Sequence, residues 1–248
     1  MTGHRLWKGM VIMYFFDGRI RYSETDNKGE LTLASLLNYF QDCSTFHSED
    51  LGLGLDYLAE RHMMWVLCYW QIVVERYPRQ CERVKTGTAP YEFKSFMGSR
   101  NFVMMSEAGD YLAKANSYWV LLDTDKQKPV APPREMLEGY EIFPRLDMDY
   151  ASRKITIPEG GSDEEPITVK KYHLDTNNHV NNGQYVDIAM EFLPADFTIR
   201  QMRAEYKKQA LLNDVFYPHV VQEEGRLVAA LNDASGKPYA VVEFTGAR

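Results

Sequence analysis

Three residues that could do chemistry lie two positions apart in the stretch HLDTNNHVNN, residues 173–182: Asp175, Asn177 and His179. Histidine is the residue type among them that ordinarily exchanges protons near neutral pH, so His179 is the candidate to activate water or polarise a carbonyl. Asp175 can orient the loop or the imidazole, and Asn177 can hold water or substrate by hydrogen bonds in either direction. In extended backbone every second side chain points to the same side. We therefore expect the three side chains to converge on one site.

A second interpretation of the same stretch is a helix N-cap, because asparagine and aspartate side chains accept hydrogen bonds from the free N–H groups of a helix start. One cap needs one such residue, whereas five surround the histidine here, so the sequence favours a site in addition to a cap. A helix that begins near Asn181 or Asn182 would present unpaired N–H groups to a developing negative charge. The expected oxyanion site is the backbone of Val180, Asn181 and Asn182.

Other kinds of site have little support. There is no GxSxG motif and no cysteine near the loop, so direct attack by water is simpler than a covalent intermediate. His173 and His179 bracket an aspartate, but their spacing is not that of HExxH and no second His/Cys cluster supplies further metal ligands. The LGLG of residues 51–54 lacks the downstream Gly and Lys of a phosphate-binding loop and is typical of a helix end. We expect no metal and no cofactor.

The surroundings of the loop occur twice in the chain. With an offset of 149, which places Asp26 over Asp175, ETDNKGELTLASLLNYFQD aligns with HLDTNNHVNNGQYVDIAME without a gap. Apolar residues in both segments follow the three-and-four spacing of a helix with one buried face. The first copy has Lys28 and Glu30 at the other two chemical positions and no histidine. The second half is therefore expected to carry the chemistry.

Extended runs rich in aromatic and β-branched residues follow each expected helix, and hairpin turns are expected at Gly109-Asp110 and Ser235-Gly236. Residues 126–166 combine clustered prolines, a Gly-Gly pair and acidic residues, which is typical of a linker, and PREMLEGY within them predicts one short helix. The pattern predicts a duplicated α+β unit: an N-terminal unit of residues 1–125, the linker, and a C-terminal unit of residues 167–248.

Composition narrows the setting. With 248 residues, 45% hydrophobic and 25% charged, the chain has the profile of a soluble globular protein, and a net charge of -7 argues against nucleic-acid binding. Three cysteines without a CxxC motif favour a reducing cytoplasm. The apolar run near residues 11–16 is too short for a signal peptide, and no stretch is long enough to span a membrane. His47 and His62 are expected to be structural or surface residues.

The sequence resembles a known family in these segments. LDTNNHVNN, then YVDIAMEFLP and RAEYKKQALLND, together with RYSETDNKGELTLASLLNYFQDCSTFHSEDLG in the first half, resemble the acyl-acyl carrier protein thioesterases, the plant FatA/FatB-like family with its bacterial relatives. The resemblance covers nearly the whole chain. It implies a double hotdog fold, two tandem units that each wrap a curved antiparallel sheet around a long helix. It also implies hydrolysis of the thioester that joins a fatty acyl chain to its carrier protein, which ends fatty acid synthesis.

The resemblance places the family's aspartate, asparagine and histidine on Asp175, Asn177 and His179. Plant members read EYRREC where this chain reads EYKKQA, so Gln209 stands in the place of a catalytic glutamate. An amide does not accept a proton as a general base, although it can orient a water or a carbonyl. We expect Gln209 to act as a positioning group on a strand beside the loop, and His179 to transfer the proton.

Substrate contacts can be assigned only by residue type. An acyl-chain tunnel in the first half is expected to involve Leu36, Phe40, Trp65, Trp70 and Met97, although residues of these types equally suit an ordinary core. A carrier protein is acidic, which calls for a basic patch. The candidates for that patch are Arg200, Arg203, Lys207 and Lys208, and a solvated strand face is the alternative.

Two other functions stay open at this stage. One is a hotdog thioesterase that acts on acyl-CoA, and the other is a non-catalytic acyl-binding protein, which the amide at Gln209 favours. Either a monomer or a homodimer is expected, since two tandem units already supply the pairing that single-unit relatives obtain by dimerising.

Overall fold

The computed structural model describes residues 13–175 and 177–247. The opening residues through Ile12, which include the start of the apolar run assessed as a signal peptide, lie outside this part of the chain. Within the described ranges no helix combines the length and the apolar character that crossing a membrane requires.

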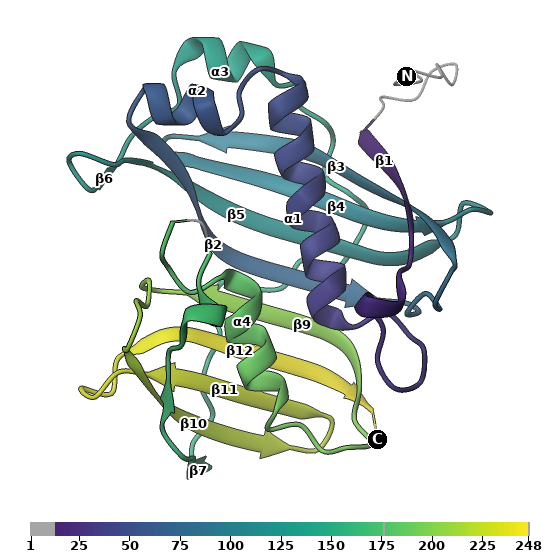
Figure 1. Ribbon diagram of the computed structural model, residues 1–248, viewed down its shortest axis with the longest axis vertical. Helices are drawn as coiled ribbons and strands as arrows, with labels where there is room; N and C mark the ends of the chain where they lie inside the picture. The colour runs from purple at the N-terminus through teal and green to yellow at the C-terminus, as the bar shows by residue number, and fades with distance from the viewer. Residues whose placement is uncertain (1–12, 176, 248) are drawn as a thin grey trace.

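The strands of both halves form one antiparallel sheet (Figure 1). Its strands are β1 (Tyr14–Arg19), β2 (Met63–Val74), β3 (Arg83–Lys94), β4 (Met97–Ser106), β5 (Tyr111–Asp123), β6 (Lys128–Pro129), β7 (Ser162–Asp163), β8 (Ile167–Thr168), β9 (Thr198–Tyr206), β10 (Val215–Glu223), β11 (Arg226–Asn232) and β12 (Pro238–Ala247). They follow the order β1-β3-β4-β5-β2-β9-β12-β11-β10-β7, with β6 paired to β5 and β8 to β10. The hairpin turns expected near residues 109 and 235 join β4 to β5 and β11 to β12.

Two helices, α1 (Leu33–Asp50) and α4 (Asn182–Met190), lie side by side on one face of this sheet, which we call the helix face (Figure 1). The apolar stripe predicted for the first helix is buried against the strands, with Leu36 and Phe40 at most 1% exposed. Two short helices, α2 (Leu55–Glu60) and α3 (Arg134–Gly139), lie at one end of the molecule. The expected double hotdog fold is confirmed.

The two halves share both a sheet and a core. β2 of the first half pairs with β9 of the second through backbone hydrogen bonds, and Trp70 lies opposite Ala204 in that register. The main hydrophobic cluster contains residues of both helices, such as Phe40 and Val186. Because neither the hydrogen bonding nor the core is interrupted between the halves, each helix is held against a surface that both halves build.

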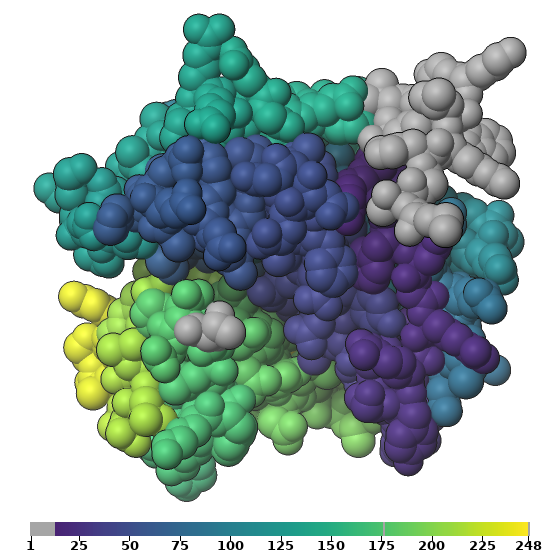
Figure 2. All heavy atoms as spheres, turned by 45° about the horizontal axis from the view of Figure 1, so that its top comes forward, coloured from purple at the N-terminus to yellow at the C-terminus, as the bar shows by residue number. Residues whose placement is uncertain are grey.

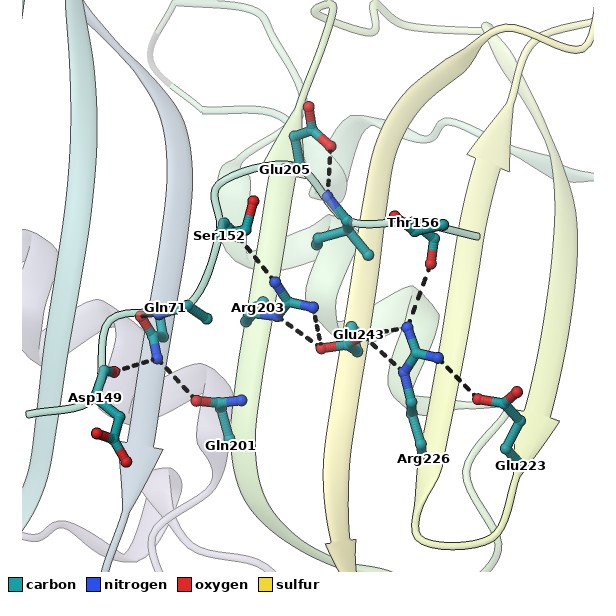
Figure 3. Close-up of polar contacts among 12 residues, drawn as sticks. Gln71, Asp149, Ser152, Thr156, Gln201, Arg203, Glu205, Glu223, Arg226 and Glu243 are labelled. Carbon is teal, nitrogen blue, oxygen red and sulfur yellow. Dashed lines mark hydrogen bonds and ion pairs between the residues drawn. The ribbon is translucent and has the colours of Figure 1, made fainter. Parts of the chain in front are cut away.

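The residues predicted as a linker cross the opposite face of the sheet, which we call the linker face. The short helix expected from PREMLEGY is α3, and the chain then runs over strands of both halves (Figure 3). Linker carbonyls accept hydrogen bonds from Gln71 on β2, Arg203 on β9 and Arg226 on β11. The linker therefore fastens the two halves together from the side opposite the helices.

The 149-residue repeat extends to details of the turns. The 3-10 helices η1 (Tyr22–Glu24) and η2 (Lys171–His173) begin 149 residues apart, and so do the helix N-caps Thr32 and Asn181. The partners of the β-bridges that close the intervening turns keep the same offset. The loop singled out by its chemistry is therefore one copy of a structural device that the fold uses twice.

Candidate active site

The loop that contains His179 is a tight turn. One carboxylate oxygen of Asp175 accepts hydrogen bonds from the backbone N–H groups of Asn177, at 2.8 Å, and His179, at 3.2 Å. The Asp175 N–H donates in turn to the His179 carbonyl, at 2.8 Å, and Asn178 takes a left-handed conformation with φ of 59°. The expectation of extended backbone is wrong, because the carboxylate gathers these amides and folds the segment back on itself.

The first half contains the same turn. One oxygen of Asp26 accepts from the N–H groups of Lys28, at 2.9 Å, and Glu30, at 3.0 Å, and Gly29 takes the left-handed conformation that Asn178 takes in the second half. A carboxylate at the first position is thus a scaffold element that needs no catalytic explanation. The two copies differ chemically at the other two positions, which Asn177 and His179 occupy in the second half.

The side chains of these two residues are accessible. His179 is half-buried and Asn177 is exposed. The hydrogen bonds described above come from their backbone N–H groups, and neither side chain makes a hydrogen bond within residues 13–175 and 177–247. Figure 2 shows the green surface of the C-terminal turn and α4 meeting the blue surface of α1 and α2. The imidazole and the amide are therefore available to a ligand that reaches this junction between the halves.

Most of the expected oxyanion site is already occupied. The Val180 N–H donates to the Ala210 carbonyl at 2.9 Å, and the Asn181 N–H donates to the His173 carbonyl at 2.8 Å. The Asn181 side chain caps α4 by accepting from the Gly183 N–H at 2.8 Å. The assignment of Val180 and Asn181 as oxyanion donors is wrong for this reason. In the part of the chain that the structure describes, the Asn182 N–H has no acceptor and remains the candidate.

Gln209 lies beside the turn but not on a strand. β9 ends at Tyr206, and Gln209 follows in an exposed connecting segment, so its expected place on a strand is wrong. The next residue, Ala210, accepts from the Val180 N–H and donates its own N–H to the Tyr185 hydroxyl at 3.0 Å. These two bonds bring the backbone of Gln209 next to that of His179, and Gln209 is exposed to solvent.

Two tyrosines hold the helix start in place. The hydroxyl of Tyr206 donates to the Asn182 carbonyl at 2.9 Å, and its ring packs edge-on against that of Tyr185, with 5.7 Å between centroids. Burial raises the pKa of both hydroxyls, so both stay protonated and able to donate. The start of α4, where the Asn182 N–H emerges, is therefore fixed by β9 on one side and by the Ala210 segment on the other.

The acyl-chain candidates separate into three groups. Leu36, Phe40 and Trp70 belong to the main core between α1 and the sheet, and the indole N–H of Trp70 is buried without an acceptor among the described residues. Trp65 packs in a second cluster at the end covered by α2 and α3. On β4 the side chain of Arg100 contacts His47 of α1, so by alternation Met97, three residues earlier, points to the linker face. The assignment of Met97 to the acyl tunnel is wrong, since residue type alone does not fix the face of a strand.

The four basic candidates do not form one patch. Arg203 is on the linker face and pairs with Glu243 at 2.6 Å, with only 13% and 4% of the two side chains exposed. Arg200 lies near the start of β9, about 20 Å from Lys207 at strand spacing, and donates to the Glu75 carbonyl. Arg200, Lys207 and Lys208 are exposed, and only the two lysines are neighbours. The expected common patch is wrong because alternation and the linker separate its members.

A surface hollow of the first half lies elsewhere. It has a volume of about 690 Å³ and is formed by β1, η1 and the outer side of α1, including Arg21, Tyr39 and Asp42. Burial raises the pKa of Asp42. None of the residues predicted for the site lines this hollow, so the hollow is not part of the candidate active site.

A sheet shared by two helix-centred units, with one of two matching turns carrying histidine and asparagine, defines a double hotdog protein with a single candidate active site. Residues 14–140 match the acyl-ACP thioesterase N-terminal domain, and residues 158–233 match the acyl-ACP thioesterase C-terminal domain. The chain belongs to the acyl-ACP thioesterase family.

Similar proteins include plant enzymes. The chain is 25% identical over 224 residues to an acyl-[acyl-carrier-protein] hydrolase, FATB1, of Cuphea viscosissima, a match that covers 84% of this chain and 53% of that protein. It is 27% identical over 201 residues to a palmitoyl-acyl carrier protein thioesterase of Gossypium hirsutum, covering 75% of this chain and 48% of that protein. The chain thus spans about half the length of these relatives.

Solved structures agree with the fold. An acyl-ACP thioesterase from Bacteroides thetaiotaomicron superposes with a TM-score of 0.85 at 21% identity, covering 93% of this chain and 96% of that one. A 12:0-ACP thioesterase from Umbellularia californica superposes with a TM-score of 0.84 at 19% identity, covering 96% and 98%. Both comparisons extend over the two hotdog units and the linker between them.

Proposed function

We propose that the protein hydrolyses the thioester between a fatty acyl chain and acyl carrier protein, and so releases the free acid and ends fatty acid synthesis. The observation that carries the proposal is the asymmetry between the two turns. The same backbone occurs twice, but only the second copy places Asn177 and His179 beside a helix start with a free N–H. The names of the plant relatives, which are acyl-acyl carrier protein hydrolases, supply the substrate class.

The proposed reaction is direct hydrolysis. A water oxygen attacks the thioester carbonyl carbon as the His179 imidazole takes a proton from the water, and the Asn182 N–H stabilises the oxyanion. Asn177 and Gln209 hold the carbonyl or the water, and Asp175 acts through the backbone bonds that shape the turn. The carbon–sulfur bond then breaks, and the thiolate takes the proton back from His179. A thiol with a pKa of about 8.5 leaves readily, so attack is the step that needs help.

We assign binding of the acyl chain to the N-terminal unit, residues 1–125, and catalysis to the C-terminal unit, residues 167–248. Leu36, Phe40 and Trp70 support this division, since they line the contact between α1 and the sheet. For the acidic carrier we propose Lys207 and Lys208, which directly precede Gln209 and whose partly exposed ion pairs contribute little to stability. The free cysteines Cys43, Cys68 and Cys81 are compatible with a cytoplasmic setting.

The test compares the wild type with His179→Ala on one acyl chain presented on carrier protein and on CoA. Loss of the proton-transfer group should lower kcat by about 10²-fold to 10⁴-fold. His62→Ala is the matched control, because the His62 side chain is exposed and, among the described residues, its partner is the surface residue Asp125. Unchanged hydrolysis by His179→Ala would show that the site is wrong. A strong preference for CoA would replace the proposal by an acyl-CoA thioesterase, and binding without turnover by a non-catalytic acyl-binding protein.

A further inference from the structure

One glutamine of α1 has a buried oxygen without a partner. The side-chain carbonyl oxygen of Gln41 is shielded from solvent and accepts no hydrogen bond among the described residues. Gln41 lies in the middle of the helix, and its backbone carbonyl is already used by Ser44 and Thr45. Leaving a buried acceptor unsatisfied costs about 1–3 kcal/mol, so the fold gives no stability reason for an amide at this position.

The position of Gln41 on α1 brings it to the start of α4. A Cβ built on Gly183, in the first turn of α4, would come within 4.0 Å of the Asn38 side-chain oxygen. Gln41 is one turn further along the same side of α1, about 4.5 Å toward its C-terminal end. The two helices lie side by side and run in opposite directions (Figure 1), so this step leads past Gly183 toward the N-terminus of α4 and the His179 turn.

The repeat shows that the amide is specific to one side of the molecule. At the 149-residue offset Gln41 corresponds to Met190, the last residue of α4, which packs against the main core. The turn with Lys28 and Glu30 is therefore matched with a helix that carries an apolar side chain. The turn with Asn177 and His179 is matched with a helix that carries an amide. Of the two equivalent junctions, the one with His179 is the one whose facing helix carries the amide.

We propose that the Gln41 side-chain oxygen accepts a hydrogen bond from the water that attacks the thioester, and so orients it between His179 and the carbonyl carbon. The inference rests on the proposed function and adds a residue from the N-terminal unit to the site. The reacting thioester group itself has no N–H or O–H to donate, whereas the water has two donors, one for Gln41 and one for the imidazole. Gln41 keeps its own protons, because an amide does not act as a base.

A second donor of different origin exists on the substrate, namely the amide N–H of the cysteamine portion of the carrier's prosthetic arm. Two small substrates with the same acyl chain distinguish a hydrogen bond from the water from a hydrogen bond from this N–H. The thioester of N-acetylcysteamine has this N–H, and the thioester of ethanethiol has no hydrogen-bond donor at that position. An interaction with the water affects both substrates equally, whereas an interaction with the arm affects only the first.

The variant to test is Gln41→Met, which installs the residue type of the equivalent position in α4. We expect kcat to fall about 10-fold to 100-fold on both thioesters with KM nearly unchanged, the effect of losing one hydrogen bond that orients the nucleophile. The melting temperature should be equal or higher, since the variant removes an unpartnered buried acceptor. Gln41→Leu provides the same test should the methionine variant not fold.

Three outcomes decide the matter. A loss of kcat on both substrates supports the proposal when Thr45→Ala, an exposed position on the same helix, keeps wild-type activity. A loss confined to the N-acetylcysteamine thioester, or unchanged kcat in an active enzyme, overturns it. A wild type that hydrolyses neither these thioesters nor acyl carrier protein overturns the proposed function instead, so the two failures are distinguishable.

Discussion

Asp26 and Asp175, which are 149 residues apart, have the same structural role. Each carboxylate gathers two backbone N–H groups and closes a turn in which the fourth residue, Gly29 or Asn178, has positive φ. An aspartate within a catalytic motif is readily taken as a catalytic group. Its presence in the copy without the histidine shows that the turn requires it for its geometry.

The first prediction uses this pair at the scale of single residues. Asp26→Ala and Asp175→Ala should each lower the free energy of unfolding by about 1 kcal/mol, since each removes two partly solvated charge-assisted bonds. Only Asp175→Ala should also lower kcat, because only its turn carries His179. Chemical denaturation and steady-state kinetics on both variants check this. Equal kinetic losses in the two variants would contradict the assignment of chemistry to one turn.

Packing between elements creates a buried basic cluster that the proposed reaction does not use. His47 on α1 is 9% exposed, and its Nδ1 accepts a hydrogen bond from Arg100 on β4 at 3.2 Å. Burial, followed by the nearby Arg100 charge, lowers the pKa of His47 from 6.5 to about 3, while the carboxylate of Asp50 opposes the shift. The imidazole is thus held neutral, and His47 is structural, one of the two roles expected from the sequence.

The second prediction follows from the sign of this shift. Below pH 6.5 the unfolded chain binds a proton at His47 that the folded protein does not bind until about pH 3. This contribution to stability is complete above pH 6.5 and is lost as the pH falls, at up to about 1.4 kcal/mol per pH unit. His47→Gln removes it, so the variant should show a flatter fall in unfolding free energy between pH 6 and 4. Parallel curves for the wild type and the variant would rule this out.

At the scale of the whole molecule, a buried ion network connects strands of the second half to the linker, which crosses both halves (Figure 3). Glu243, 3% exposed, accepts from Arg203 at 2.7 Å and from Arg226 at 2.8 Å. Both arginines also donate to linker carbonyls. Removal of the single carboxylate would leave two cations under the linker without their shared partner.

The third prediction tests whether the halves unfold together. Glu243→Leu should lower the free energy of unfolding by about 3 kcal/mol and the melting temperature by about 6–12 °C. All four tryptophans lie in the first half, so their fluorescence reports that half, whereas far-UV circular dichroism reports both. Because β2 and β9 pair in one sheet, the two signals should fall at the same temperature. A circular dichroism transition that precedes the fluorescence change would show independent halves.

Much of the fold was accessible from the sequence because it depends on local periodicity. The helix spacing, the strand composition and the short helix α3 are patterns over neighbouring positions, and the 149-residue repeat is the recurrence of such a pattern in the second half. The structure confirms each. The turn was located correctly as well. Its conformation was not, because the backbone hydrogen bonds to Asp175 compete with an extended chain, and alternation of side-chain types does not report them.

The duplicated architecture, the family and the position of the histidine turn could therefore be predicted from the sequence. Which polar groups remain free depends on tertiary contacts. The Val180 and Asn181 N–H groups are used by Ala210 and His173, Arg203 is neutralised by Glu243, and Gln41 is left with an open acceptor. The hydrogen bonds and the ion pair depend on atoms separated in the chain that meet within about 3 Å, and the open acceptor of Gln41 depends on the lack of such a contact, neither of which a sequence period encodes.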